Sequence, residues 1–385
     1  MGKRSSTDHS NISKGNRDMK IGINGTFLNE KPTGAGLFTK EVYRTLLSLN
    51  REILLFSPVS TDKMPSNSIY KVPEMMKGSR RLLNSLYRFF YINTILPGLC
   101  KLKGVDVLYC PILEFPFISH TPTVVHIHDL HFIHFSSEFG FAAPRLKFSL
   151  KIIRRIVKRV IVSSEFIKNE LIRLTDIRES QIDVVPLAYN NSVFKPMPLE
   201  IRKDFLNKNG LRENYILFVG SLFPYKNLKT LVDAFLRIKD KIPHSLVVVG
   251  RREFSLKPPV KDERITYMDY VDGEDLPFFY SCADLFVYPS LKEGFGIAPL
   301  EAMACGTPVI SSNGGSLPEV VGDAAILFDP EDSESLSELI INVINNEGLR
   351  KELIEKGFKN IKNFSWRKTA EGILASCERT LKEKG

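Results

Sequence analysis

Short apolar runs alternate along the chain with longer amphipathic segments. In the first half the runs KIGING, REILLFSP, VDVLYCP, PTVVHIHD and SQIDVVPLA have the length and the β-branched content of buried strands. Between them, segments such as GLFTKEVYRTLLSL have apolar residues at helical spacing. Because strands that are separated by helices form parallel sheets, the pattern predicts an α/β fold.

The alternation stops once and then starts again, which indicates two domains. In the second half YILFVGS, HSLVVVG, ADLFVYPS, TPVISS and AAILFD are strand-like, and NLKTLVDAFLRI and SESLSELIINVINN are helical. We expect domains at residues 19–195 and 212–363, joined by a connection at 196–211 that contains PMP and a short helix. Residues 1–18 are polar without apolar periodicity, so we expect a disordered extension. The ligand is expected in the cleft between the two sheets.

Composition agrees with a globular protein that has two cores. The chain has 385 residues, of which 43% are hydrophobic and 25% are charged. Its apolar runs are too short to span a bilayer and no signal peptide is found, so the protein is expected in the cytoplasm. The five cysteines are scattered without any C-x-x-C, which argues against a disulfide framework and against a zinc ribbon.

Basic residues are concentrated in the first half. The net charge is +9: residues 1–200 contain 28 Lys and Arg against 17 Asp and Glu, and residues 201–385 contain 25 against 27. The densest stretch, PRLKFSLKIIRRIVKRVIVSS, interleaves charges with apolar residues and predicts a basic amphipathic helix that runs into a strand within RRIVKRVIVSS. Its basic residues are Arg145, Lys147, Lys151, Arg154, Arg155, Lys158 and Arg159.

Two interpretations of this helix are open. It is either a solvated surface element or a contact with anionic lipid headgroups, to which each Lys or Arg contributes about 1 kcal/mol near the surface. A second basic and aromatic stretch, KGSRRLLNSLYRFFYINTILPG, favours the anionic membrane surface as a partner. Nucleic acid is not an expected partner, because no recognised binding motif accompanies the charge.

Two glutamates flank a glycine-rich turn in the stretch KEGFGIAPLEAMACGTPVI. Glu293 follows a buried strand, and Glu301 lies beyond the turn in a segment of good helix formers. Pro299 suits the first position of a helix, so Glu301 is expected in the first helical turn. Free N–H groups at such a helix start attract phosphate, and the two carboxylates can accept hydrogen bonds from sugar hydroxyls. For Glu301 alone, a carboxylate that stabilises the helix dipole is the alternative.

Two other strand-to-helix connections carry weaker signals. KPTGAGLFTKEV joins the first strand to the first helix through Gly34 and Gly36, a loop that lets backbone approach a phosphate or a sugar. It lacks the full dinucleotide fingerprint. In VGSLFPYKNLKTL, Lys226 follows a strand and precedes a helix that begins near Asn227. Its ammonium can pair with a diphosphate in the cleft, and a surface lysine is the alternative.

Four histidines occur within HIHDLHFIH: His126, His128, His131 and His134. A metal site is the weaker interpretation, because no carboxylate or cysteine set accompanies them at a recognised ligand spacing. On a strand, His126 and His128 face the same side, and His128 lies at the carboxyl end where ligands bind. We therefore expect His128 in the cleft and His126 in the core.

These residues carry a resemblance to a known family. The runs VSSEF, VVPLAYNNSVF, YILFVGSLFPYKNLKTLVDAF and EDLPFFYSCADLFVYPSLKEGFGIAPLEAMACGTPVISSNGGSLPEVVGDAAILFDPED resemble the retaining nucleotide-sugar glycosyltransferases of family 4. The similarity is greatest to mannosyltransferase-like members that build bacterial surface polysaccharides. It covers nearly all of the chain from Met19, and its most specific feature is the glutamate pair. It implies the GT-B fold, two Rossmann-like domains that face each other across a cleft, with a last helix at 364–385 that returns to the first domain.

The resemblance also implies roles for individual residues. Glu293 and His128 would be catalytic and lie beside the transferred sugar, Glu301 would bind the ribose hydroxyls, and Lys226 would neutralise the diphosphate. Further donor-binding positions are Gly34, Gly36, Ser221 and the backbone of Gly294, Phe295, Gly296 and Ile297.

The chain departs from the family pattern at a few positions. Many relatives have an arginine where this chain has Ser221 or Tyr225. We hypothesise that Arg251 or Arg252, after the strand HSLVVVG, supplies the missing charge to the phosphates. Ala188 also replaces a glycine that is usual in VVPLAYN.

The expected function is that of a metal-independent hexosyltransferase. The donor would be GDP-mannose, as a first guess, or a UDP-sugar, without any cofactor, and the acceptor would be a glycan or a lipid-linked glycan. The protein is expected at the inner face of the cell membrane, as a peripheral protein held by its basic first domain. The alternatives are a non-catalytic membrane or nucleic-acid binding module, which leaves the glutamate pair unexplained, and a sugar epimerase or phosphorylase on the same fold.

Overall fold

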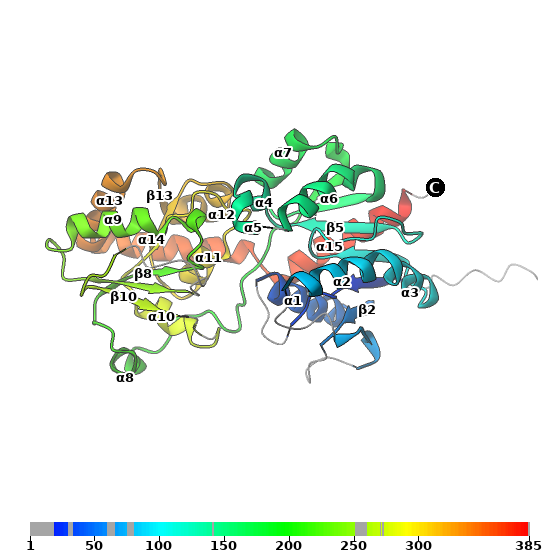
Figure 1. Cartoon of the computed structure of the whole chain (residues 1–385). Helices are drawn as coiled ribbons and strands as arrows, with labels where there is room; N and C mark the ends of the chain where they lie inside the picture. Colours follow the sequence, from blue (N-terminus) through cyan, green and yellow to red (C-terminus); the bar gives the residue numbers. More distant parts are fainter. Residues whose placement is uncertain are drawn as a thin grey trace, which may run out of the picture.

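The computed structural model describes residues 19–29, 34–59, 66–74, 81–140, 142–250, 260–269, 271 and 273–383. In this part of the chain the paired strands form two parallel sheets, one of seven strands and one of six. The sheets lie in two halves of an elongated molecule (Figure 1). The prediction of two Rossmann-like domains is confirmed, and the expected domain boundaries stay a prediction.

The seven-stranded sheet has the order β3-β2-β1-β4-β5-β6-β7. Alternate residues of its strands enter two different cores: one face packs on α1 and α15, and the other on α2, α3, α6 and α7. The strands are β1 Lys20–Asn24, β2 Glu52–Ser57, β3 Ile69–Lys71, β4 Val107–Cys110, β5 Thr123–Ile127, β6 Arg159–Val162 and β7 Ile182–Val184. The helices are α1 Gly34–Ser48, α2 Arg81–Thr94, α3 Leu96–Leu102, α4 His131–His134, α5 Ser136–Phe139, α6 Ala142–Ile156 and α7 Glu165–Leu174.

The six-stranded sheet repeats the same layout with the order β10-β9-β8-β11-β12-β13. Its strands are β8 Tyr215–Val219, β9 Ser245–Val249, β10 Ile265–Met268, β11 Leu285–Tyr288, β12 Val309–Ser312 and β13 Ala325–Phe328. Its helices are α8 Arg202–Asn209, α9 Leu228–Ile238, α10 Leu276–Cys282, α11 Ile297–Ala304, α12 Leu317–Val321, α13 Ser333–Asn345 and α14 Glu347–Asn360. In each sheet the strand order reverses at one point, between β1 and β4 or between β8 and β11, where open α/β sheets bind ligands.

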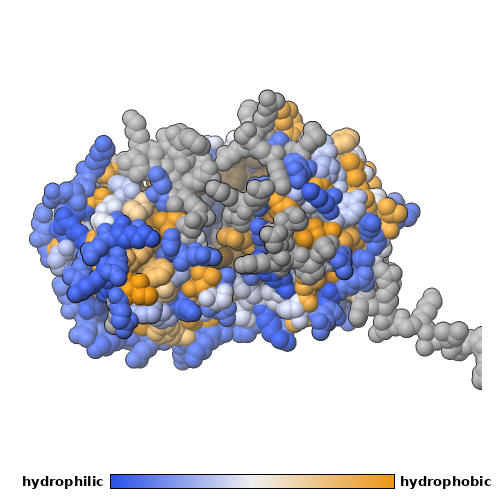
Figure 2. Space-filling view, turned by 90° about the horizontal axis from the view of Figure 1, so that it is seen from below, coloured by the Kyte–Doolittle hydropathy of each residue, from blue (hydrophilic) through white to orange (hydrophobic). Residues whose placement is uncertain are grey.

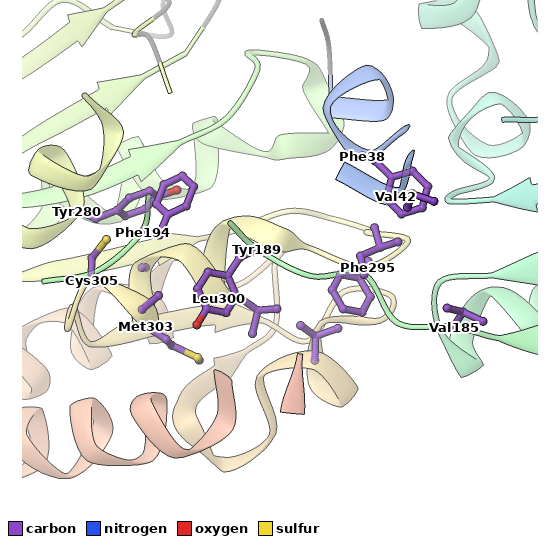
Figure 3. Close-up of a cluster of buried hydrophobic side chains, with 14 of the residues drawn as sticks. Phe38, Val42, Val185, Tyr189, Phe194, Tyr280, Phe295, Leu300, Met303 and Cys305 are labelled. Atoms are coloured by element: carbon purple, nitrogen blue, oxygen red, sulfur yellow. The ribbon is translucent and has the colours of Figure 1, made fainter. Parts of the chain in front are cut away.

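One hydrophobic core extends through both halves. It contains Phe38 of α1 and Val185 after β7, together with Phe295 and Leu300 from the half that holds the six-stranded sheet. Figure 3 shows Phe38 and Phe295 among the side chains of this cluster. Apolar packing therefore joins the two halves at the inner end of the cleft.

The chain crosses between the two halves twice. The first crossing runs from β7 to β8, and the second runs from α14 to α15 (Trp366–Lys382), which packs on α1, β4, β5 and β6. The hydroxyl of Thr369 in α15 donates to the carbonyl oxygen of Pro186 at 2.8 Å, so the two crossings are hydrogen-bonded to each other. In the described residues, no helix has both the length and the apolar character that a bilayer span requires.

Two local expectations are wrong. Gly34 and Gly36 are not in a loop, because α1 begins at Gly34 and Gly36 is buried within it. The second is the placement of Arg159 in the basic helix, because this helix ends at Ile156 and runs into the strand β6, which pairs with β5. Arg159 is consequently a buried strand residue whose guanidinium is paired with Asp183 and Glu383 rather than exposed on the helix.

Candidate functional site

Lys226 and Glu293 form a buried ion pair at the switch point of the six-stranded sheet. Lys226 ends a short 3-10 turn after β8 and Glu293 follows β11, so two neighbouring strands bring them to one crevice. Nζ of Lys226 donates to Oε1 of Glu293 at 2.7 Å and to the hydroxyl of Tyr288 at 2.8 Å. That hydroxyl donates in turn to Oε1 of Glu293 at 3.0 Å. The three side chains therefore form a closed ring of hydrogen bonds.

Both members of this pair carry their charge. Burial acts to raise the pKa of Glu293, but Lys226 and His131 outweigh burial and hold the pKa below its ordinary value. Burial acts to lower the pKa of Lys226, but the Glu293 carboxylate outweighs it, and the lysine pKa is raised. An anion that approaches Lys226 must therefore compete with Glu293 for the ammonium group.

The turn after Glu293 brings the two halves into contact. A side-chain carbon on Gly294 would lie 1.9 Å from the carbonyl oxygen of His128 and 2.9 Å from Cβ of Asp129, so only glycine permits this approach. The Gly294 carbonyl accepts a hydrogen bond from Oγ of Ser164 at 2.8 Å. Gly296 has a φ of 88° and precedes α11, a left-handed conformation that also favours glycine. Both glycines of the motif are therefore required by the backbone geometry.

Glu301 lies in the second turn of its helix and not, as expected, in the first. Because α11 begins at Ile297, two residues before Pro299, Glu301 is the fifth residue of the helix and lies in its second turn. Its Oε2 accepts a hydrogen bond from the hydroxyl of Tyr280 at 3.0 Å. Burial raises the pKa of Glu301 to about 7, although the hydrogen bond from Tyr280 acts in the opposite direction. Near neutral pH this carboxyl is therefore partly protonated.

The other residues of the turn divide between core and cleft. The ring of Phe295 is buried in the core (Figure 3). It meets the ring of Phe364 edge-on, with centroids 5.7 Å apart. Ile297 is half-buried and lines a pocket in the cleft. Only the backbone of Phe295 is therefore available to a ligand.

His128 belongs to a hydrogen-bonded chain in the first half. Its Nε2 lies 2.8 Å from the carbonyl oxygen of Pro111, so this nitrogen carries the proton. Burial lowers the pKa of His128 to about 4, so Nδ1 is unprotonated and accepts from Oγ of Ser163 at 3.2 Å. The Ser163 oxygen then accepts from Nε2 of the fully buried His126, and Nδ1 of His126 accepts from Tyr109. His128 is thereby fixed as a neutral Nε2–H donor.

A pocket of about 460 Å³ opens between the two halves in front of His128. Its wall includes Gly34 and Phe38 of α1 on one side and Ile297 of α11 on the other. The structure thus brings Gly34, His128 and Ile297 to one cavity, whereas Gly36 does not line it.

The two positions that depart from the family pattern lie next to Lys226. The ring of Tyr225 stacks on His131 across the cleft, with centroids 4.4 Å apart. Burial raises the pKa of Tyr225, and the nearby Ser221 acts in the opposite direction. An aromatic side chain thus fills the position where many relatives have an arginine. Arg251 and Arg252 lie outside the described residues.

Further contacts hold the cleft closed on its outer side. The carboxylate of Glu319 accepts hydrogen bonds at 3.0 Å from the N–H groups of both Glu165 and Phe166, at the start of α7. Nζ of Lys292 donates to Glu170 at 2.8 Å. Both contacts join one half of the molecule to the other.

Two site residues were missed by sequence reasoning. Tyr288 is the last residue of β11, and its place at the carboxyl end of a strand could have identified it. Tyr280 lies inside α10 and has no comparable signal. In the part of the chain that the structure describes, no three His, Cys, Asp or Glu side chains are placed to hold a metal ion.

Two family models match the chain. The one described as Glycosyltransferase Family 4 matches residues 32–192, and the one described as Glycosyl transferases group 1 matches residues 201–360. Each match covers most of the strands of one sheet.

The chain is also similar to individual glycosyltransferases. O-antigen chain mannosyltransferase B of Escherichia coli is 34% identical over 218 residues, which are 54% of this chain and 57% of that protein, so the match spans little more than half of the relative. An uncharacterized glycosyltransferase of Methanocaldococcus jannaschii is 28% identical over 362 residues, 88% of this chain and 93% of that protein. Sucrose-phosphate synthase from Thermosynechococcus elongatus has the same fold, with a TM-score of 0.73 at 20% identity over 95% of this chain and 100% of that one. The chain belongs to the family 4 glycosyltransferases.

Proposed function

We propose that the protein is a retaining hexosyltransferase that takes its sugar from a nucleoside diphosphate, GDP-mannose being the first candidate. The observation that carries the proposal is the buried Lys226–Glu293 pair, which lies in the cleft close to His128. The choice of mannose is supported by the O-antigen mannosyltransferase among the relatives. The acceptor is a glycan or a lipid-linked glycan of surface polysaccharide synthesis.

The donor diphosphate is the group that replaces Glu293 on Lys226. The lysine ammonium and the N–H groups at the start of α11 carry positive charge, which stabilises the leaving nucleoside diphosphate. Once it is released from Lys226, the Glu293 carboxylate can accept hydrogen bonds from hydroxyls of the donor sugar. One exchange of partners therefore supplies both the phosphate contact and the sugar contact, and no metal ion is required for either.

Two other side chains complete the donor site. His128 is neutral and its one N–H group, on Nε2, donates to the carbonyl oxygen of Pro111, so it can donate to the sugar only if the sugar replaces Pro111 as the acceptor, and it does not serve as an acid. Glu301 accepts hydrogen bonds from the ribose hydroxyls, a role that requires its ionised form. The free-energy cost of burying the ionised Glu301 carboxylate is then offset only when the nucleotide is bound.

A membrane-facing surface on the first half is supported by α2 and α6. Leu83, Leu86 and Phe90 project from one side of α2 and are each more than half exposed, as is Phe148 of α6. The space-filling view shows several hydrophobic patches among hydrophilic ones on this half, at the right of the picture (Figure 2). These four exposed apolar side chains and the basic residues of α6 provide the apolar and cationic contacts with which a peripheral protein binds anionic lipid at the inner membrane face.

Thermal denaturation in the presence of nucleotides tests the proposal. GDP-mannose or GDP should raise the melting temperature, because a ligand that binds only the folded state stabilises it. The increase should vanish in Lys226→Met. If neither guanine nor uracil nucleotides change the melting temperature of the wild type, the protein is not a nucleotide-sugar transferase.

A further inference from the structure

A second charged cluster lies at the switch point of the seven-stranded sheet. Glu114 follows β4, Arg88 comes from α2 and Arg145 comes from α6. Arg88 donates to both carboxylate oxygens of Glu114, from Nε at 2.6 Å and from Nη2 at 2.9 Å. Nη2 of Arg145 donates to Oε1 of Glu114 at 2.6 Å. All three side chains line the same pocket as His128.

The cluster carries an excess positive charge. The two guanidinium groups together outweigh burial and hold the pKa of Glu114 below its ordinary value, so one carboxylate is shared by two cations. The one other acidic residue among the described residues of the pocket wall is Asp129, which lies at the Gly294 contact and accepts the N–H of His131. Among the described residues its carboxyl forms no ion pair with Arg88 or Arg145.

Both arginines have guanidinium N–H groups that can donate to a ligand. Among the described residues, Nη1 of Arg88 and Nε of Arg145 have no hydrogen-bond partner. Their side chains are 19% and 23% exposed, so a group in the pocket can reach them. Guanidinium groups have the fork geometry that matches phosphate oxygens.

The wall next to the cluster is apolar. It is formed by Phe132, Phe139 and Leu146, and α2 and α6, which hold the arginines, also carry the exposed Phe90 and Phe148. A phosphate attached to an apolar group fits these surroundings better than a free phosphate ion.

We propose that Arg88 and Arg145 bind a phosphate or diphosphate group of the acceptor, with Glu114 holding the two guanidinium groups in place. The inference rests on the proposed function, because it names the chemical class of the acceptor in the same cleft. A purely structural ion-pair cluster is the competing explanation, and opposite effects of two substitutions separate them.

Binding is measured by titration calorimetry with saturating GDP, so that the donor site is filled. The probes are farnesyl diphosphate, mannose 1-phosphate and inorganic pyrophosphate, with farnesol as the uncharged control. In Arg145→Gln the Arg88–Glu114 pair stays intact and the excess charge is gone, so affinity should fall by about tenfold or more. In Glu114→Gln the excess charge grows, so affinity should be kept or increased. Arg367→Gln, which removes an exposed ion pair with Glu371 on α15, is the control and should bind like the wild type.

The outcomes are distinct. Binding of farnesyl diphosphate without pyrophosphate binding indicates a lipid-linked acceptor, and binding of mannose 1-phosphate indicates a soluble sugar phosphate. The proposal is overturned if no probe binds the wild type, or if Arg145→Gln binds as well as Arg367→Gln does. If Arg145→Gln does not fold, weaker binding by Glu114→Gln overturns it instead. Absence of GDP binding in the same samples would refute the proposed function itself, whereas GDP binding without probe binding refutes only this inference.

Discussion

The backbone of Gly294 lies directly against the carbonyl oxygen of His128, where any side chain on the glycine would collide with it. This contact connects the turn that bears Glu293 with the strand end that bears His128. The distance between the two proposed catalytic residues is therefore set by how closely two backbones approach, and not by long side chains.

Gly294→Ala should separate the two halves at this point. The added methyl group meets backbone atoms, which cannot rotate away, so the closed arrangement has to open by more than an ångström. Misplacement of reacting groups on this scale costs about 100-fold in rate. We expect kcat/KM for sugar transfer to fall by that order, and small-angle scattering to show a larger radius of gyration. Gly98→Ala, which meets no atom within 4 Å, is the control and should keep wild-type activity.

Removal of one member of the Lys226–Glu293 pair should cost more stability than removal of both. Lys226→Met leaves a buried carboxylate without its cation, for which about 3 to 5 kcal/mol of unfolding free energy is a typical loss. Lys226→Met combined with Glu293→Gln leaves no charge, so it should be more stable than Lys226→Met alone. Urea denaturation of the single and double variants measures the difference. Equal stabilities would show that the pair is not energetically coupled.

Glu301 should make stability depend on pH in a specific window. Its pKa is raised from 4.5 to about 7 in the folded chain, so the folded state holds a proton that the unfolded state releases between these values. The contribution of Glu301 to the free energy of unfolding is fully present below about pH 4.5 and is lost as the pH rises through about 7. Relative to Glu301→Gln, the melting temperature of the wild type should therefore fall between about pH 4.5 and pH 7. A difference that is constant with pH would contradict the raised pKa.

Chelation of divalent ions should leave sugar transfer unchanged. Lys226 and the start of α11 supply the positive charge at the diphosphate in the proposed mechanism, so EDTA removes nothing that the reaction uses. Initial rates with EDTA and with added Mg²⁺ or Mn²⁺ should agree within about twofold, well under the effect expected for loss of a charge at the phosphate. A rate that collapses in EDTA and returns with metal would refute the proposed role of Lys226.

Vesicle binding should depend on the exposed apolar side of α2. Phe90→Glu places a charge where the ring would enter the lipid interface, so sedimentation with vesicles rich in phosphatidylglycerol should decrease. High salt should weaken binding of the wild type as well, because the contribution of the basic residues is screened. Leu327→Glu places the same charge at an exposed apolar residue on β13, outside α2, and should have no effect. Loss of binding in both variants would argue against a specific surface on α2.

The fold could be predicted because its strands are buried on both faces. β4, β5 and β9 are apolar or buried at every position, so the sequence shows them directly as short uninterrupted runs. The start of α1 was not predicted, since glycine has low helix propensity, and Gly34 and Gly36 suggested a loop. Packing of α1 on α15 overrides that local preference.

The site was predicted residue by residue but not as a set of contacts. Lys226 and Glu293 were each recognised at a strand end, yet their ion pair depends on β8 and β11 being neighbours, and 66 other positions separate them in the sequence. The Arg88–Glu114–Arg145 cluster was not predicted for the same reason. Each of its residues comes from a different part of the chain, and their proximity depends on how these parts pack. The helical position of Glu301 was wrong by two residues, since Gly296 allows the helix to begin at Ile297, before Pro299.

The paired crossings of the chain determine how the cleft can open. Two crossings that are hydrogen-bonded to each other at Thr369 and Pro186 restrict the relative movement of the two halves more than a single crossing would. We therefore expect a motion that separates Gly294 from His128 to be restricted in direction. The C-terminal helix α15 is therefore part of the restraint between the two halves. Cutting the chain before Trp366 would leave a single crossing, and the two halves could then move more freely relative to each other.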